Sequence, residues 1–276
     1  MQGHSAWSPP GGTLGAIVEQ TTQRVLALHA RRGELESALA GLSAPPAFGA
    51  ALRGASVRVI AEVKRRSPSR GAINAAMDAP AQADAYATGG AAAISVLTEP
   101  AHFGGSPADL TAVRQRVGAR VPVLKKDFHI DEIQLVEARA LGAAAALLIV
   151  RALPPGDLLR LTAYARRIGL ETLVEVHSDD ELARALDAGA DVIGVNSRDL
   201  ETLEVDPAVP ERLVARIPRA MVAVWESGVS APSDVERAAA FGADAVLVGS
   251  ALSSSGTPAA AVRALAGVAR RDGVRA

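Results

Sequence analysis

The sequence contains no cysteine in its 276 residues. The protein therefore has no disulfide bond, no thiolate nucleophile and no site in which cysteine binds zinc or an iron–sulfur cluster. A chain without thiols suits a reducing compartment, and we expect the protein to be cytoplasmic.

Neither sign of charge is in excess, since 29 lysines and arginines face 30 aspartates and glutamates for a formal net charge of −1. This balance gives no electrostatic reason to expect nucleic acid or an anionic membrane as a partner. Long hydrophobic runs are also missing. The most apolar stretch covers residues 141–150, whereas a transmembrane helix needs about 20 residues. We therefore expect neither nucleic acid nor a membrane among the partners.

A short phrase occurs four times along the chain. Each copy has a glycine that ends a helix, one or two small residues, and then an apolar run of strand length. This order is typical of a helix that leads into a parallel strand buried on both faces. The copies cover residues 89–97, 141–150, 188–196 and 241–250.

Four further β-branched runs, at residues 57–64, 121–126, 170–176 and 221–226, bring the number of expected strands to eight. Their spacing of about 27 residues leaves room for one helix after each strand. The pattern predicts an α/β fold, a single (β/α)8 TIM barrel, with an open doubly wound sheet as the alternative. Residues 1–12 are expected to be a loose tail. Residues 13–276 form the barrel domain, which includes an N-terminal helical extension at 13–56.

Polar residues stand at the ends of strands that should be apolar. In the first strand, the two-residue alternation puts Glu62 and Lys64 on one face, opposite Val59, Ala61 and Val63. The apolar face must pack on helices, so the two charges point into the barrel. They form either a structural ion pair or part of a functional site, and the strand alone does not decide between these.

Other strand ends show the same feature. Lys125 and Lys126 lie on opposite faces of the third strand; alternation does not tell which points inward, and the other is expected to be solvated. Glu175, Asn196 and Glu226 end three later strands. Because the carboxyl ends of barrel strands meet on one rim, this set predicts an active site there.

The last two strands end in Ser227-Gly228 and Gly249-Ser250. The loops after strands seven and eight of such barrels commonly bind phosphate through backbone N–H groups, although these glycines could serve tight turns alone.

Several functional motifs are absent, including the phosphate-binding loop of nucleotide hydrolases, the dinucleotide-binding fingerprint and the serine-hydrolase elbow. The histidines lack metal-ligand spacing, so we expect no metal. His102, His129 and His177 are expected at the rim, and residues 253–255 are interpreted as a solvated loop.

Taken together, the motifs resemble those of indole-3-glycerol phosphate synthase, over about residues 14–252. The motifs that carry the resemblance are Ala61-Glu-Val-Lys-Arg-Arg-Ser-Pro-Ser69, Ser95-Val-Leu-Thr-Glu99, Phe103-Gly-Gly-Ser106, Leu124-Lys-Lys-Asp-Phe128, Leu147-Leu-Ile-Val150, Val174-Glu-Val176, Gly194-Val-Asn-Ser-Arg-Asp-Leu200, Glu226-Ser-Gly228 and Val248-Gly-Ser250.

The resemblance implies a cofactor-independent lyase of tryptophan biosynthesis. Its substrate would be 1-(2-carboxyphenylamino)-1-deoxyribulose 5-phosphate. Lys126 would be the general acid of ring closure, Glu175 would move protons in the decarboxylation and dehydration half, and Lys64 would hold the carboxylate or act as acid in one step. The remaining roles implied are a polar shell of Glu62, Asn196 and Glu226, a phosphate site of Ser67, Ser227, Gly228, Gly249 and Ser250, a rim support at Arg198, and anthranilate contacts at Phe103 and Phe128.

Two positions depart from the family pattern. Trp225 stands where a small residue is usual, and we expect it to meet the helical shell or a loop; Asn74 stands where the first loop is often basic. The rival functions are phosphoribosylanthranilate isomerase, which would need a cysteine, and a catalytically silent phosphate-binding barrel. The expected partner is a small phosphorylated substrate, and the expected state is a monomer or weak homo-oligomer.

Overall fold

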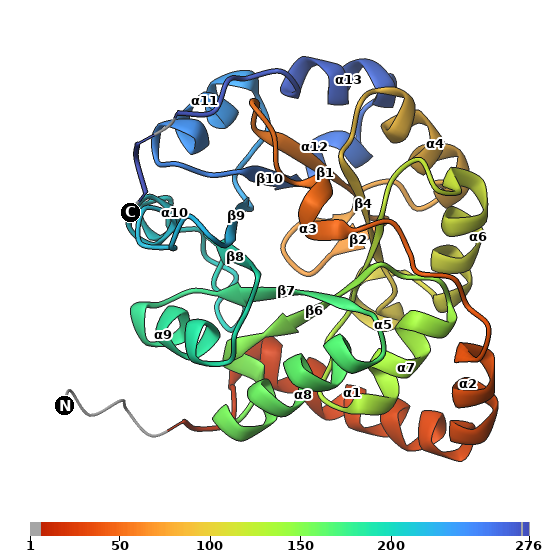
Figure 1. Ribbon diagram of the computed structural model, residues 1–276. Helices are drawn as coiled ribbons and strands as arrows, with labels where there is room; N and C mark the ends of the chain where they lie inside the picture. The colour runs from red at the N-terminus through yellow and green to blue at the C-terminus, as the bar shows by residue number, and fades with distance from the viewer. Residues whose placement is uncertain (1–6, 272, 276) are drawn as a thin grey trace.

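Eight parallel strands close into a barrel in the computed structural model, which describes residues 7–271 and 273–275 (Figure 1). Each strand pairs with its neighbours in chain order, and the last pairs with the first, so the predicted (β/α)8 barrel is confirmed and the open sheet is wrong. The strands are β1 (Arg58–Val63), β4 (Ala93–Leu97), β5 (Val123–Lys126), β6 (Ala145–Ile149), β7 (Glu171–Val176), β8 (Val192–Asn196), β9 (Val222–Glu226) and β10 (Ala245–Val248).

Helices follow the strands and surround the barrel (Figure 1). In the described part of the chain, no helix is long and apolar enough to span a membrane. Two short strands, β2 (Arg66–Ser67) and β3 (Gly71–Ala72), pair in the loop after β1. The helices are α1 (Gly12–Ala30), α2 (Arg32–Leu39), α3 (Phe48–Ala51), α4 (Ala79–Thr88), α5 (Pro100–Phe103), α6 (Pro107–Val117), α7 (Glu132–Ala140), α8 (Pro155–Arg167), α9 (Asp179–Asp187), α10 (Ala208–Val214), α11 (Pro232–Ala240), α12 (Ser250–Ser253) and α13 (Pro258–Leu265), with a 3-10 turn at Val150–Ala152.

Side-chain caps fix where several of these helices begin. The Ser178 hydroxyl accepts the Glu181 N–H at 3.2 Å, as its expected capping role requires, and the Asp78 carboxylate accepts the Ala81 N–H at 2.9 Å. At α7, Asp131 and Gln134 form a reciprocal capping box. Such caps satisfy amide groups that the first helical turn leaves without partners, so the loops before these helices have defined ends.

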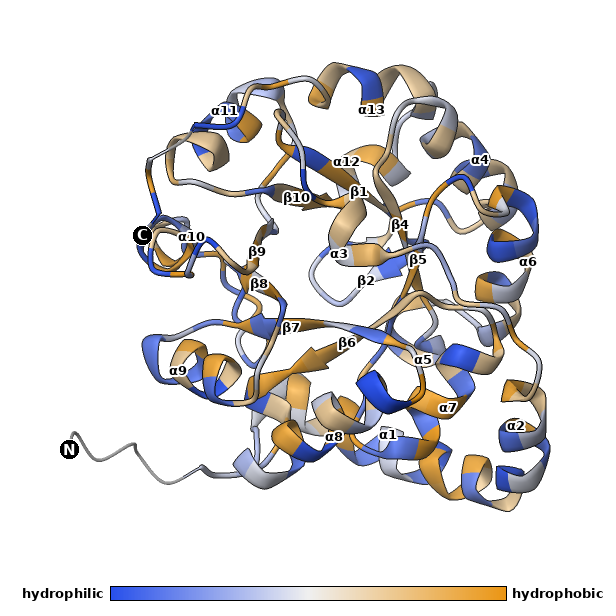
Figure 2. Ribbon diagram, viewed as in Figure 1, coloured by the Kyte–Doolittle hydropathy of each residue, from blue (hydrophilic) through white to orange (hydrophobic). Residues whose placement is uncertain are grey.

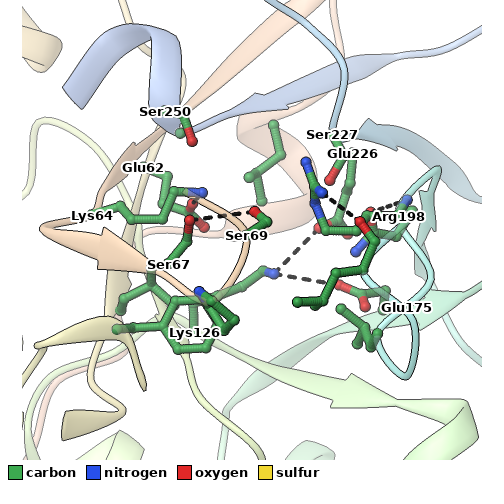
Figure 3. Close-up of a pocket in the computed structure, with 18 of the residues that line it drawn as sticks. Glu62, Lys64, Ser67, Ser69, Lys126, Glu175, Arg198, Glu226, Ser227 and Ser250 are labelled. Atoms are coloured by element: carbon green, nitrogen blue, oxygen red, sulfur yellow. Dashed lines mark hydrogen bonds and ion pairs between the residues drawn. The ribbon is translucent and has the colours of Figure 1, made fainter. Parts of the chain in front are cut away.

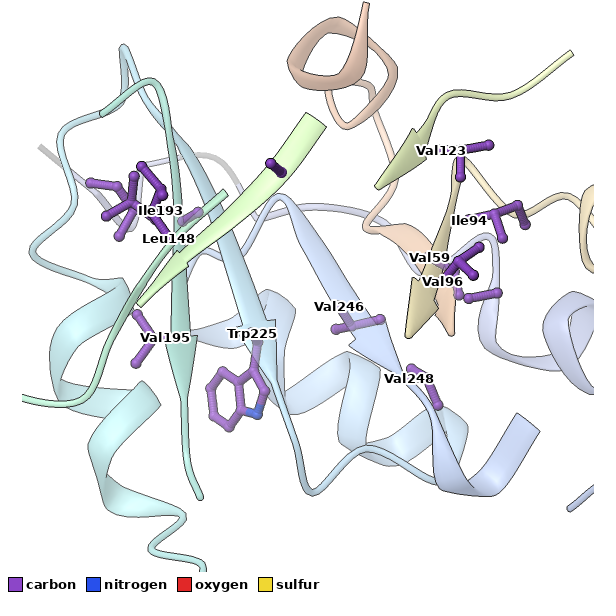
Figure 4. Packing of buried hydrophobic residues seen from close by; sticks show 14 of the residues in the cluster. Val59, Ile94, Val96, Val123, Leu148, Ile193, Val195, Trp225, Val246 and Val248 are labelled. Atoms are coloured by element: carbon purple, nitrogen blue, oxygen red, sulfur yellow. The ribbon is translucent and has the colours of Figure 1, made fainter. Parts of the chain in front are cut away.

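The alternating faces of the strands build two separate apolar clusters. The outward faces form one cluster with residues of the helices, and Figure 4 shows Val59, Ile94, Leu148 and other members of this cluster on the strands. Trp225 belongs to this outer cluster, where its ring lies 6.3 Å from that of Phe241, so the expected contact with the helical shell is confirmed. Hydropathy colouring likewise shows strands that are mainly apolar and helices that carry both kinds of residue (Figure 2).

The N-terminal extension closes both ends of the barrel. Leu14 and Ile17 of α1 reach the carboxyl-end interior, whereas Phe48 of α3 packs at the amino end. The backbone N–H groups of Phe48 and Gly49 donate to the Glu171 carboxylate, which fixes α3 at the start of β7. Of the expected tail at 1–12, residues 1–6 lie outside the described residues; Trp7 donates its indole N–H to the backbone of the 3-10 turn at 3.3 Å.

Asp244 holds the C-terminal segment against the amino end of the barrel. Its carboxylate is fully buried, accepts the Ala223 N–H at 2.8 Å, and pairs with Arg270 at 2.8 Å and with Arg275. Removing one partner of a buried ion pair leaves the other charges uncompensated.

We therefore expect Asp244→Asn to lower the free energy of unfolding by about 3–5 kcal/mol, measured by urea titration. Asp191→Asn is the matched control, because its ion pair with Arg166 lies on the surface with side chains 79% and 61% exposed. That control should lose less than about 1 kcal/mol. Equal effects of the two variants would contradict the structural role of Asp244.

Candidate active site

A cavity of about 330 Å³ opens at the carboxyl ends of the barrel strands (Figure 3). The structure brings together around it all the site residues that the sequence singled out. These are Glu62, Lys64, Ser67, Phe103, Lys126, Phe128, Glu175, Asn196, Arg198, Glu226, Ser227, Gly228, Gly249 and Ser250.

Lys126 lies at the centre of the polar wall of this cavity. Its ammonium nitrogen is 3.3 Å from Glu175 Oε2 and 3.4 Å from Glu226 Oε2, as the dashed lines in Figure 3 show. The lysine ends β5, and the two glutamates come from β7 and β9 across the barrel. Three strands thus place one cation between two carboxylates in a site mostly closed to water.

Glu62 and Lys64 of the first strand form a second pair, with Nζ 2.7 Å from Oε1. The Ser253 hydroxyl supports this strand end: it donates to the Glu62 carbonyl at 2.9 Å and accepts the Lys64 N–H at 3.2 Å. Ser253 is fully buried, so the interpretation of its segment as a solvated loop is wrong at this residue. The short α12 turns the hydroxyl back toward β1.

The cluster holds three carboxyls and two ammonium groups in a region of low exposure. Burial raises the pKa of Glu226 to about 8, because the neighbouring Glu175 carboxylate adds to the effect of burial and the Lys126 charge offsets only part of it. Burial acts in the same direction on Glu175, but Lys126, His177 and hydrogen bonds from neighbours outweigh it and lower the pKa of Glu175. Glu175 and Glu226 therefore share one proton near neutral pH.

Lys126 responds to the same field. Burial alone would lower the pKa of Lys126, but the carboxylates of Glu175, Glu226 and Glu62 raise it above the ordinary value. In turn, Lys64 and Lys126 overcome burial and lower the pKa of Glu62. With Glu226 protonated, two ammonium groups balance two carboxylates. The free site is then neutral and has one proton on a carboxyl and others on lysines.

Lys125 points away from the cavity, so the structure settles the open question of which lysine faces inward. Contrary to expectation, Lys125 is not solvated: its side chain is 1% exposed, and Nζ lies 2.6 Å from Glu137 Oε2 and 3.8 Å from Asp127 Oδ2. Asp127 also binds Arg24 of α1 at 2.9 Å. This network ties the N-terminal extension to the strand that carries Lys126.

The loops after β9 and β10 also line the cavity. Ser227 and Gly228 have φ angles of 66° and 75°, a left-handed conformation that is uncommon for a residue with a side chain. Gly249 approaches the first strand so closely that a Cβ there would lie 2.6 Å from Lys64 Nζ and also overlap Glu62 Oε1. These backbone features leave amide groups and open space beside a cation, which suits an anionic group.

This close approach makes Gly249→Ala a sharp test of the loop. The added methyl group must displace Lys64, so we expect kcat/KM for a phosphorylated substrate to fall about 10²-fold with little loss of stability. Steady-state kinetics and thermal melting measure the two effects. Gly256→Ala is the control, since nothing lies within 4 Å of a Cβ at that position. A Gly249→Ala protein with unchanged kinetics would remove the loop from the site.

The remaining wall is aromatic and basic. The rings of Phe103 and Phe128 lie 6.1 Å apart beside the cavity. Arg198 donates to the Leu203 carbonyl at 2.8 Å and lies near enough to Arg70 that burial and the second cation lower its pKa. Arg70 was not predicted; it stands in the first loop close in sequence to Asn74, and it lines the cavity.

Other pocket residues also escaped sequence reasoning. Thr13, Leu14 and Ile17 come from the extension, where a helical apolar stripe gives no sign that it covers a distant site. Of the histidines expected at the rim, His177 follows β7 directly, whereas His129 is 1% exposed and its Nδ1 contacts the Leu147 carbonyl at 2.7 Å, so His129 is not a rim residue.

Fold and site together define a (β/α)8-barrel protein with a buried acid–base cluster beside two glycine-containing loops. The family model described as indole-3-glycerol phosphate synthase matches residues 14–265. "Indole-3-glycerol phosphate synthase 1" of Streptomyces coelicolor is 53% identical over 226 residues, covering 82% of this chain and 83% of that protein. "Indole-3-glycerol phosphate synthase 2" of the same organism is 46% identical, covering 93% and 99%. The chain belongs to the indole-3-glycerol phosphate synthase family, an enzyme family of carboxy-lyases, as the motif resemblance implied.

Among solved structures, the chain is similar to "Thiamine phosphate pyrophosphorylase from Pyrococcus furiosus", with a TM-score of 0.58, 17% identity and coverage of 76% of this chain and 93% of that one. This likeness concerns the barrel alone.

Proposed function

We propose that the cavity converts 1-(2-carboxyphenylamino)-1-deoxyribulose 5-phosphate into indole-3-glycerol phosphate, carbon dioxide and water, with the roles given below. The observation that carries these roles is the position of Lys126 between Glu175 and Glu226, in a cavity that the loops of Gly228 and Gly249 and the rings of Phe103 and Phe128 also line. A substrate with both an aromatic ring and a phosphate suits this lining.

Ring closure is the first step. The ring carbon that bears the carboxylate attacks the ketone carbon, and negative charge develops on the ketone oxygen. Lys126 donates a proton to this oxygen, since a cation in a site of low exposure stabilises an alkoxide more strongly than water does. Loss of carbon dioxide then restores the aromatic ring and leaves a hydroxyl on the new five-membered ring.

Dehydration is the second half. Glu175 takes the proton from the ring carbon next to nitrogen, and an ammonium group, Lys126 or Lys64, protonates the departing hydroxyl. Counted with the substrate as a carboxylate, each turnover takes up one proton from water. Asn196 and Glu62 hold these groups in place.

The residues that line the cavity indicate how the substrate binds. The phosphate lies against Ser227, Gly228, Gly249 and Ser250, with Ser67 beside it, and Lys64 neutralises part of its charge. The anthranilate ring lies against Phe103 and Phe128. Arg198, with Arg70 near it, supports the rim of the cavity. We further propose a cytoplasmic enzyme that acts without a cofactor, as a monomer or weak homo-oligomer.

The experiment mixes the purified protein with the carboxyphenylamino ribulose phosphate in the presence of a chelator and follows indole fluorescence and carbon dioxide release. We expect both signals in equal amounts. Absence of both would contradict the proposal and favour a silent binding barrel. Phosphoribosylanthranilate serves as the control substrate, and its isomerisation without indole formation would support the rival enzyme instead.

A further inference from the structure

His177 lies just beyond the strand that carries Glu175. Because the two residues are two positions apart, their side chains leave the backbone on the same side. The imidazole bridges two carboxyl groups: Nε2 lies 3.5 Å from Glu175 Oε1, and Nδ1 lies 3.2 Å from Glu181 Oε2. The histidine side chain is 16% exposed, so this bridge runs through a largely buried region.

The turn between β7 and α9 fixes the ring. Glu181 stands in the first turn of α9 and accepts the backbone N–H of His177 at 2.7 Å with the same oxygen that meets Nδ1. Its own N–H is bound by the Ser178 hydroxyl. The Ser178 hydroxyl and the His177 N–H thus hold Glu181 in place, and Glu181 in turn orients the imidazole.

The inner ends of the bridge have no other partner. Among the described residues, Glu175 Oε1 and His177 Nε2 are buried atoms without a hydrogen bond, and they face each other. Glu175 meets Lys126 with its other oxygen, Oε2. A buried carboxylate oxygen and a buried ring nitrogen both lose free energy when left unpaired, and a proton between them satisfies both.

We propose that His177, oriented by Glu181, is a positioning residue for Glu175: its protonated ring donates to Oε1 and so keeps Oε2 directed at Lys126 and the substrate. This inference rests on the proposed function only where it names Glu175 as the base. It adds a three-residue unit of Glu175, His177 and Glu181 to the site.

The charges around the ring favour its protonated form. Burial acts against the imidazolium, but the neighbouring carboxyls outweigh it and raise the pKa of His177 above its ordinary value of 6.5. In the other direction, the imidazolium is one of the charges that lower the pKa of Glu175. The charged or titratable groups that face His177 are Glu175 on β7, Glu181 on α9, Glu226 on β9 and Asp199 after β8, with Lys126 on the far side of Glu175.

A titration of the folded protein tests the contact without any turnover. Histidine side-chain NMR of the wild type and of Glu175→Gln gives the pKa of His177 in both, with the signal assigned from His177→Asn. We expect the Glu175→Gln protein to show a His177 pKa lower by about half a unit or more. The same pKa in both proteins would overturn the contact, whether or not the wild type forms indole-3-glycerol phosphate.

The kinetic arm compares His177→Asn with His102→Asn, a histidine near the mouth whose ring contacts Gln20. In His177→Asn the acid limb of the kcat profile should move up by about one pH unit, with KM unchanged, because Glu175 loses a nearby cation. Added imidazole should restore kcat to His177→Ala. An unshifted pH profile, or a loss of kcat that is equal at every pH and that imidazole does not relieve, would show that His177 serves packing alone. An inactive wild type would instead refute the proposed function.

Discussion

Lys126→Met should lower the activity of the protein, whereas Lys125→Met should lower its stability, although the two lysines are adjacent. We expect Lys126→Met to lose about 10³-fold or more in kcat, because the general acid and the cation beside the developing alkoxide disappear together. Its stability should change little, since Glu175 and Glu226 can bind a further proton when the ammonium between them is lost.

Lys125→Met should keep its turnover per folded molecule and lose about 3 kcal/mol of stability, because Glu137 and Asp127 stay behind in the buried network. Single-turnover kinetics and urea unfolding of both variants separate the effects. A fully active Lys126→Met protein would remove Lys126 from the chemistry. Loss of turnover in a well-folded Lys125→Met protein would show that the outer network, and not the cavity alone, controls the reaction.

Lys125 and Lys126 also illustrate how much of the fold and of the site could be predicted from the sequence. The barrel was predictable because its strands are largely buried on both faces and four of them follow a helix that ends in glycine, so one local pattern recurs along the chain. The rim site was predictable because burying polar residues at such strand ends costs free energy, which indicates that those residues have a function. Alternation has two possible phases, however, and either phase directs one of the two adjacent lysines toward the inside of the barrel. The sequence alone therefore did not decide between Lys125 and Lys126.

What remained hidden depends on contacts between distant segments. Asp127 binds Arg24, which is 103 positions away, and Ser253 binds the end of β1 from 191 positions away. The sequence gives no sign of these contacts of Arg24 and Ser253, because an arginine on a helix usually faces water and a serine in a run of serines is usually solvated. Arg70 could have been suspected, because a loop that lacks its usual charge at one position can supply it from another.

Glu226→Gln should make the protein more stable, and the gain should grow with pH. The folded protein holds a proton on Glu226 up to a pKa of about 8, whereas a glutamate in the unfolded chain releases it near its ordinary value of 4.5. The stabilising contribution of this proton is complete below the ordinary pKa and is lost as pH rises through about 8. Glutamine resembles the protonated acid and cannot lose that proton.

Thermal and urea unfolding at pH 5 and pH 9 measure the difference. At about 1.4 kcal/mol per pKa unit, Glu226→Gln should gain roughly 2–4 kcal/mol relative to the wild type between the two pH values. Glu62→Gln is the control with the opposite sign, because its carboxylate pairs with Lys64 at 2.7 Å and has a lowered pKa, so its loss should destabilise the protein throughout that range. If Glu226→Gln showed no gain at pH 9, the shared proton between Glu175 and Glu226 would be excluded. The expected gain, combined with slower turnover, would mean that this barrel keeps a buried acid whose ionisation destabilises the fold because the site needs that acid beside Lys126.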